Sequence, residues 1–194
     1  MTLYEKEHHS RHYINDATEF YYSDENLRDS LRPHLVTRAI LVPHAGLSIS
    51  GKIAKMAYDR IDWNRIDEVI ILSTHHKSVK HPGNIVPKSN RFELNEHISF
   101  PLIDLNLNID KNDEAFNREH SWLTQMPFIK PSLPTAIILI SEYDENLAEQ
   151  ISHRIGNNTL LIANTDLLHC GKNYNVECPH DIEQITEILL KVSP

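Results

Sequence analysis

Residues 38–76, RAILVPHAGLSISGKIAKMAYDRIDWNRIDEVIILSTHH, indicate the fold class of this chain. An apolar, β-branched run at 38–43 and a second one at 67–74 are typical of buried strands. Between them, residues 48–61 carry apolar side chains at helical spacing. A strand, a helix and another strand in this order predict two parallel strands that are joined by a crossover helix.

The second half of the chain repeats this alternation. Strands are predicted at 135–141 and 159–165, and a helix at 144–155 lies between them. A last helix at 181–192 has one apolar face, and an early helix is expected to begin near Ser23. This alternation predicts that the strands at 135–141 and 159–165 are also parallel members of the sheet.

The middle of the chain has weaker signals and no boundary between domains. Residues 80–118 are rich in Asn, Pro and Asp, with only faint strand patterns such as 97–103. We expect a polar lead-in at 1–15 and one domain at 16–194. The predicted fold class is an α/β sandwich with a largely parallel or mixed central sheet that is flanked by helices.

Composition limits the classes of function. The 194 residues are 40% apolar and 24% charged, which is typical of soluble globular proteins. A formal charge of −8 argues against non-specific binding of nucleic acid. No apolar run approaches the roughly 20 residues that span a bilayer, and the polar N-terminus does not resemble a secretory signal. We expect a cytoplasmic protein whose partner is a small molecule or a peptide.

Polar side chains follow three of the predicted strands. His44 comes after the first, the pair His75 and His76 after the second, and Asp166 after the last. Ligands of parallel α/β sheets bind beyond the carboxyl ends of the strands. A single His at a strand end is more often a turn or surface residue, but three such positions at one edge predict a site.

Spacing suggests which of these side chains face the site. His75 and His76 are adjacent, so in an extended segment they point in opposite directions, and we expect His75 to face the site. Asp166 and His169 are three residues apart, which suits an acid and a base on one helical turn. Asp166 as the N-cap of a helix is an equally good interpretation.

Cys178 precedes the last predicted helix. Thiolate is the form of cysteine that coordinates metals, and a helix N-terminus favours it. Together with His44 and His75, this thiolate would form a site for iron, copper or zinc with open coordination positions. The alternative interpretation of Cys178 is a small buried apolar residue.

Six stretches carry a resemblance to a known family. In chain order they are EFYYSDENLRDSL (19–31), VPHAGLSISGKIAKMAYDRI (42–61), VIILSTHH (69–76), EHSWLTQMPFI (119–129), NTDLLHCG (164–171) and CPHDIEQI (178–185). Together they resemble the motifs of the Memo family, whose fold is similar to that of class III, non-haem-iron extradiol dioxygenases. The resemblance runs from about residue 16 almost to the C-terminus.

The resemblance implies a metal centre. Matched position by position, it places the metal on His44, His75 and Cys178, with Asp166 and His169 in the same pocket as candidate catalytic residues. It implies Fe(II) or Cu as cofactor, with Zn as a third option. The dioxygenase relatives have a carboxylate as the third ligand, so Cys178 argues against extradiol ring cleavage.

Two features depart from the family pattern. Leu123 occupies a position where the family usually has Glu, and Gln125 one where His or Gln is common. A carboxylate expected near the pocket is therefore missing from this segment. The segment between 171 and 178 is also shorter than the helical insertion that family members typically have there, and little follows the last helix.

Three functions compete for this site. The first is a metal-dependent oxidoreductase related to the non-haem-iron dioxygenases. The second is a non-catalytic module that binds phosphorylated peptides or proteins, which the missing Glu at Leu123 would fit. A zinc hydrolase is the weakest of the three, because no HExxH or similar spacing is present.

Overall fold

The computed structural model describes residues 2–3, 38–76 and 82–166, together with residues 172, 175 and 177. The helices predicted near residue 23 and at 181–192 lie outside these residues. The division into a lead-in at 1–15 and one domain at 16–194 stays a prediction.

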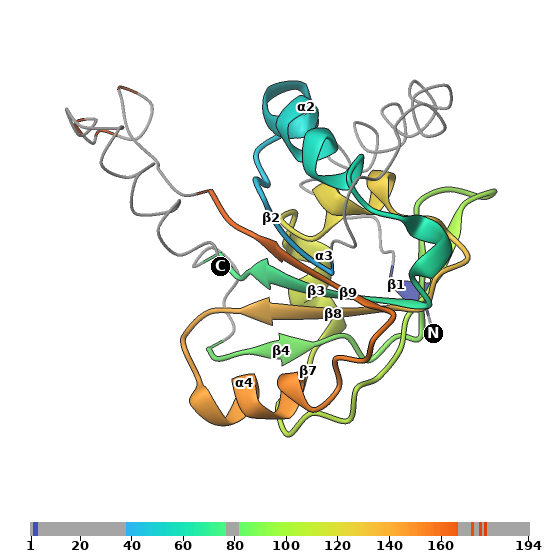
Figure 1. Ribbon diagram of the computed structural model, residues 1–194. Helices are drawn as coiled ribbons and strands as arrows, with labels where there is room; N and C mark the ends of the chain where they lie inside the picture. Colours follow the sequence, from blue (N-terminus) through green and yellow to red (C-terminus); the bar gives the residue numbers. More distant parts are fainter. Residues whose placement is uncertain are drawn as a thin grey trace.

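The described chain forms two β-sheets with short helices (Figure 1). The main sheet contains, in order across it, β2 (Ala39–Val42), β9 (Thr159–Asn164), β3 (Glu68–Thr74), β8 (Thr135–Ile140), β4 (Ile85–Val86) and β7 (Asp110–Lys111). The smaller sheet contains β1 (Thr2–Leu3), β5 (Arg91–Glu93) and β6 (Ser99–Pro101). The helices are α2 (Leu47–Tyr58), α3 (Asp113–Arg118), α4 (Glu145–Ser152) and the 3₁₀ helices η1 (Trp63–Arg65) and η2 (Leu123–Phe128).

The predicted mixed α/β sheet is confirmed. Strands β2, β9, β3 and β8 are mutually parallel neighbours, whereas β4 runs antiparallel to β8. All four predicted long strands are present, and their ends differ from the predicted ends by at most one residue. The faint pattern at 97–103 corresponds to β6.

Helices α2 and α4 lie on opposite sides of the main sheet (Figure 1). Helix α2 joins β2 to β3, and α4 joins β8 back to β9, so the two connections cross the sheet in opposite directions. Parallel crossovers are right-handed, and two that run in opposite directions therefore place their helices on opposite faces. Leu147 and Ile151 of α4 pack on one face, and Leu47 and Ala54 of α2 pack on the other.

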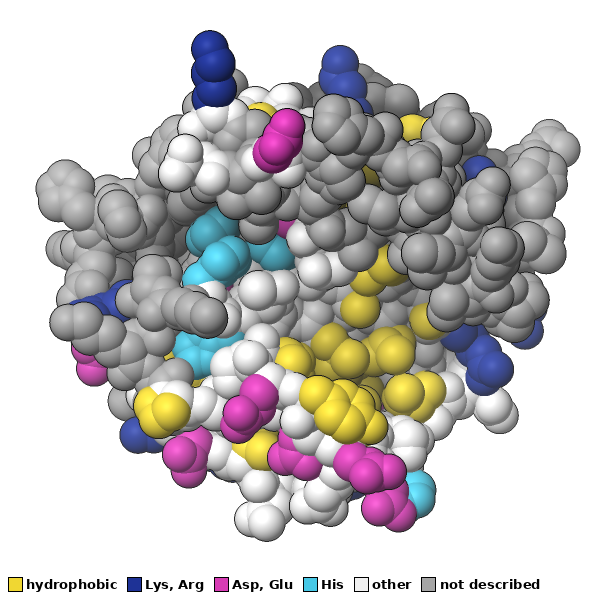
Figure 2. Space-filling view, turned by 90° about the vertical axis from the view of Figure 1, so that its left-hand side faces the viewer, with side chains coloured by type: hydrophobic (Ala, Val, Ile, Leu, Met, Phe, Trp, Pro, Cys, Tyr) yellow, Lys and Arg dark blue, Asp and Glu magenta, His cyan; other side chains and the backbone are white. Residues whose placement is uncertain are grey.

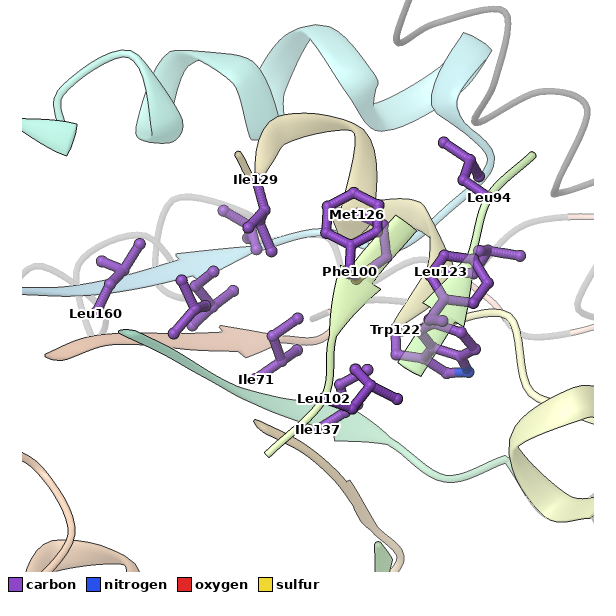
Figure 3. Close-up of a cluster of buried hydrophobic side chains, with 14 of the residues drawn as sticks. Ile71, Leu94, Phe100, Leu102, Trp122, Leu123, Met126, Ile129, Ile137 and Leu160 are labelled. Atoms are coloured by element: carbon purple, nitrogen blue, oxygen red, sulfur yellow. The ribbon is translucent and has the colours of Figure 1, made fainter. Parts of the chain in front are cut away.

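Aromatic side chains fill the core between the main sheet, η2 and the smaller sheet (Figure 3). Phe92 meets Trp122 edge to face, with 4.8 Å between the ring centroids, and Phe100 is fully buried beside them. The indole Nε1–H of Trp122 donates to the backbone oxygen of Phe116, at 3.2 Å. This packing holds the segment before η2 against the sheet. No helix within the described ranges is long and apolar enough to cross a membrane.

The carboxyl ends of the parallel strands share one edge of the sheet. In Figure 1 the arrowheads of β3 and β8 point to the left, and Figure 2 views the molecule from that side. Histidine side chains gather there in a hollow of the surface (Figure 2). This is the edge at which the sequence predicts a site.

Candidate metal centre

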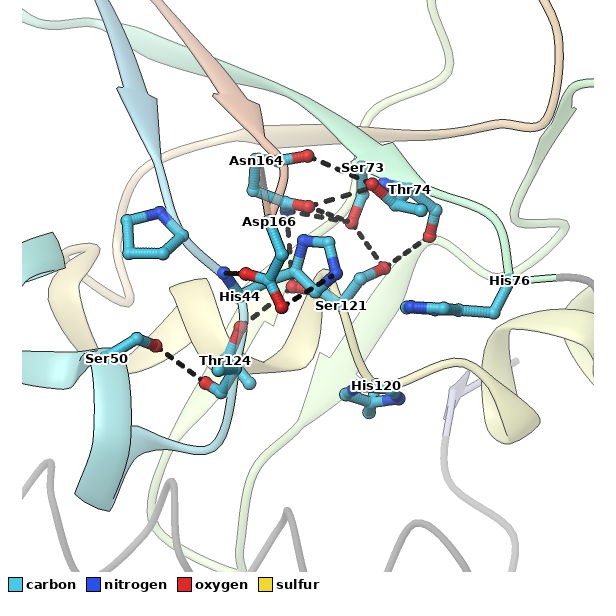
Figure 4. Close-up of polar contacts among 12 residues, drawn as sticks. His44, Ser50, Ser73, Thr74, His76, His120, Ser121, Thr124, Asn164 and Asp166 are labelled. Atoms are coloured by element: carbon cyan, nitrogen blue, oxygen red, sulfur yellow. Dashed lines mark hydrogen bonds and ion pairs between the residues drawn. The ribbon is translucent and has the colours of Figure 1, made fainter. Parts of the chain in front are cut away.

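His44 and Asp166 are brought together by the pairing of β2 with β9. Val42 pairs with Asn164, and His44 and Asp166 each lie two residues further along parallel strands. The backbone N–H of His44 donates to Oδ1 of Asp166 at 2.9 Å, and the ring Nε2 of His44 lies 3.9 Å from Oδ2 (Figure 4). His44 is only 2% exposed. The ends of β2 and β9 therefore lie close together, as the sequence predicts.

His75 and His76 follow β3 and have different partners. The ring Nδ1 of His75 lies 3.2 Å from the backbone oxygen of Gly83, and its backbone N–H donates to the oxygen of Ile140. The ring of His76 lies edge to face with that of His44, with 5.2 Å between the centroids. The ring of His76 thus contacts that of His44, and the ligand role of His75 stays a prediction.

A third imidazole comes from the segment between α3 and η2. The ring of His120 stacks on that of His76, with 4.8 Å between the centroids, and its centroid lies 6.2 Å from that of His44. Ligand atoms of His76, His120 and the neighbouring Glu119 all lie within 4.8 Å of one another. These three residues could hold a metal ion.

Glu119 is a buried carboxylate that accepts four hydrogen bonds. Its Oε2 accepts from the backbone N–H of His76 at 2.7 Å. Its Oε1 accepts from the His76 ring at 2.9 Å and from the backbone N–H groups of His120 and Ser121 at 2.8 and 2.9 Å. Burial alone would raise the pKa of Glu119, but the hydrogen bonds from His76 and Ser121 and the charge of His76 lower this pKa to about 2.

The pKa values of the two stacked imidazoles shift in opposite directions, because a hydrogen bond to Glu119 dominates at His76 and burial dominates at His120. The hydrogen bond to Glu119 raises the pKa of His76, against the effect of burial, and the negative charges of Glu119 and Asp166 act in the same direction. Burial lowers the pKa of His120, and the charges of His76 and His44 lower it further, although both carboxylates oppose this. Neutral imidazole is the form that binds metals, so a metal would compete with a proton at either ring, and at His76 this competition extends to higher pH than at His120.

A chain of hydrogen bonds fixes the strand ends around these residues (Figure 4). Nδ2 of Asn164 donates to Oγ of Ser73 at 2.8 Å, and Ser73 Oγ lies 2.7 Å from Oγ of Ser121. Ser121 Oγ in turn donates to the backbone oxygen of Thr74 at 2.5 Å. The chain ties β9, β3 and the segment after Glu119 together, because its members come from all three.

Leu123 and Gln125 of the motif at 119–129 both lie in the protein interior. Leu123 is 1% exposed and belongs to the apolar core, so the residue that replaces the family's Glu packs instead of lining the site. Gln125 is also buried, and its Nε2 donates to the backbone oxygen of Pro43 while its Oε1 accepts from the hydroxyl of Tyr58. Glu119, four residues before Leu123, provides a carboxylate at the site.

Sequence reasoning missed Glu119, His120 and the contact of His76 with His44. The strand-end rule could not find the first two, because they follow the short helix α3 and no strand. The available signal was the Glu-His pair at the start of the motif at 119–129. The remaining predicted site residues, His169 and Cys178, lie outside the described residues, and their roles stay predictions.

Comparisons with known proteins agree with the resemblance in the sequence. A MEMO1 family protein of Thermoplasma volcanium is 26% identical over 164 residues, which cover 77% of this chain and 60% of the relative. A second, of Pyrococcus furiosus, is 27% identical over 155 residues, with 69% and 53% covered. A third, of Sulfolobus acidocaldarius, is 29% identical over 155 residues, with 71% and 55% covered.

The chain thus spans between 53% and 60% of the length of these three relatives. The family model for Memo-like proteins matches residues 6–192. Since this match covers nearly all of the sequence, the chain belongs to the Memo family.

Proposed function

We propose that this chain binds a metal ion in the hollow at the carboxyl edge of the main sheet, and that iron or copper there serves redox chemistry. The observation that carries the proposal is the convergence of three imidazoles, from His44, His76 and His120, beside the carboxylates of Glu119 and Asp166. Imidazole suits zinc, copper and iron, so this set of donors fits the metals that the family resemblance implies.

The surroundings of His75 also fit a ligand. The backbone oxygen of Gly83 can only accept a hydrogen bond, so the nearby Nδ1 of His75 carries a proton, and in the neutral ring form that binds metals Nε2 then has the lone pair. Nε2 is buried and has no hydrogen-bond partner among the described residues. Metal-binding histidines usually donate their second ring N–H to a carbonyl or a carboxylate. These contacts support the ligand set of His44, His75 and Cys178 that the resemblance implies.

The residues beside the metal would handle protons and hold the site in shape. Bound in this hollow, iron or copper would supply redox chemistry at its open coordination positions, and zinc would supply a Lewis acid. Asp166 holds the backbone of His44, and we propose that it works with His169 as an acid/base pair. A cytoplasmic location would keep Cys178 reduced and able to ligate.

Metal loading tests the proposal. The full chain would be purified anaerobically, loaded separately with Fe(II), copper and zinc, freed of excess metal and analysed for bound metal. We expect about one ion per chain in the wild type and a loss of binding in His44→Ala. His97→Ala is the matched control, because His97 is an exposed histidine in the turn between β5 and β6. Absence of bound metal in the wild type, or unchanged binding by His44→Ala, would contradict the proposal.

A further inference from the structure

Glu119 is connected to His76 at two points. One carboxylate oxygen accepts the backbone N–H of His76 and the other accepts its ring Nδ1–H. Backbone N–H groups of His76, His120 and Ser121 donate to the two oxygens of Glu119, so these oxygens act as acceptors and Nδ1 of His76 carries the proton. Both the position and the tautomer of this imidazole are therefore set by one carboxylate, and Nε2 is the nitrogen that remains for a ligand.

The ring of His76 is placed where it can share a ligand with two other imidazoles. It extends from the end of β3 toward His44, with His120 close to it (Figure 4). The His44 ring is nearly perpendicular to it, at 85°, and the His120 ring is nearly parallel, at 16°. The three rings come from separate segments of the chain, so the tertiary fold is what brings them together.

Glu119 itself has the contacts of a residue that positions another. Its side chain has no exposed surface, and four N–H donors already surround its two oxygens. Direct coordination of a metal by the oxygen that accepts the His76 ring would compete with the bond that orients this ring. A histidine whose second nitrogen donates to a carboxylate is a common arrangement behind metal ligands.

We propose that His76 ligates the metal through Nε2 and that Glu119 is the positioning residue that holds it there. The family resemblance assigns neither role. This inference rests on the proposed metal binding at this edge of the sheet. It leaves the role of His75 independent, because His75 has a different orienting partner in Gly83.

Cobalt(II) bound to the full chain provides the test. Its affinity would be measured by competition with a chelator, and its visible absorption spectrum would report the ligand set. We expect His76→Ala to weaken binding by more than about tenfold and to change the spectrum. We expect Glu119→Gln to keep the stoichiometry but to weaken binding by about 10- to 100-fold, because the amide cannot accept from all four donors.

A control variant and a fallback variant separate a loss of metal binding from a general effect of substitution. Glu93→Gln changes a half-exposed carboxylate on β5 and should bind cobalt like the wild type. If His76→Ala does not fold, His76→Gln replaces it, since its amide can still donate to Glu119. A folded His76 variant with wild-type affinity and spectrum would overturn the ligand role, while loss of metal in His44→Ala alone would leave the proposed function standing. A folded Glu119→Gln that binds no cobalt at any concentration would make Glu119 a ligand and overturn its positioning role.

Discussion

Glu119 shows how one buried residue organises the centre. A carboxylate without exposed surface is costly unless donors surround it, and here four N–H groups do so. Its low pKa and the raised pKa of His76 have the same origin, which is the contact between the two side chains. This contact therefore contributes to folding stability in a way that depends on pH.

The pH dependence of the unfolding free energy should show the contribution of Glu119 to stability. Its pKa in the folded chain, about 2, lies below its ordinary value of 4.5, so its contribution is present above pH 4.5 and is lost as the pH falls toward 2. Over that range the free energy of unfolding of the wild type should fall by about 3 kcal/mol more than that of Glu119→Gln. Denaturant unfolding of both proteins at several pH values measures this difference.

At higher pH, deprotonation of His76 weakens the stabilisation that comes from its contact with Glu119. Because its pKa is raised on folding, its share is present below its ordinary pKa of 6.5 and is lost as the pH rises through the higher folded value. The pair should therefore stabilise the fold most between about pH 4.5 and 6.5. Parallel stability curves for the wild type and Glu119→Gln throughout the acid range would contradict this account.

At the scale of elements, the long strands could be predicted from the sequence, whereas the shortest strands and the segments between elements could not. The runs that became β3 and β8 are continuous and β-branched, a pattern that buried parallel strands require on both faces. Strands β4 and β7 are only two residues long, too short for any period to appear in the sequence. Residues 119–121 are held at the site by tertiary contacts, such as the hydrogen bond from Ser121 to the backbone oxygen of Thr74. Contacts of this kind leave no periodic pattern in the local sequence, so the position of this segment could not be predicted.

Leu123 tests whether η2 belongs to the core or to the site. Its side chain lies in the same apolar cluster as Met126 and Phe100 (Figure 3), so Leu123→Glu would bury a carboxylate without the donors that surround Glu119. We expect this variant to lose more than about 3 kcal/mol of unfolding free energy, whereas Leu123→Met should lose less than about 1.5 kcal/mol. Thermal and denaturant unfolding compare the two. A stable Leu123→Glu with increased metal affinity would instead place this position at the site.

At the scale of the whole molecule, the parallel sheet explains why distant residues meet. His44 and Asp166 are separated by 122 residues, yet the pairing of β2 with β9 brings them into contact. The strand-end rule predicted this meeting from sequence alone. The same rule could not choose between His75 and His76, because that depends on the partners Gly83 and Glu119, which other parts of the fold provide.

The position of a bound metal in a crystal would show whether the ion lies at the carboxyl edge of the main sheet. Crystals of the full chain loaded with iron or copper would be measured at the absorption edge of the metal, and its anomalous scattering would locate the ion. We expect a peak in the hollow beside the rings of His44, His76 and His120, and the loss of this peak in crystals of His44→Ala. A metal-loaded crystal with its anomalous peak away from this edge of the sheet, or with no peak, would contradict metal binding by these residues.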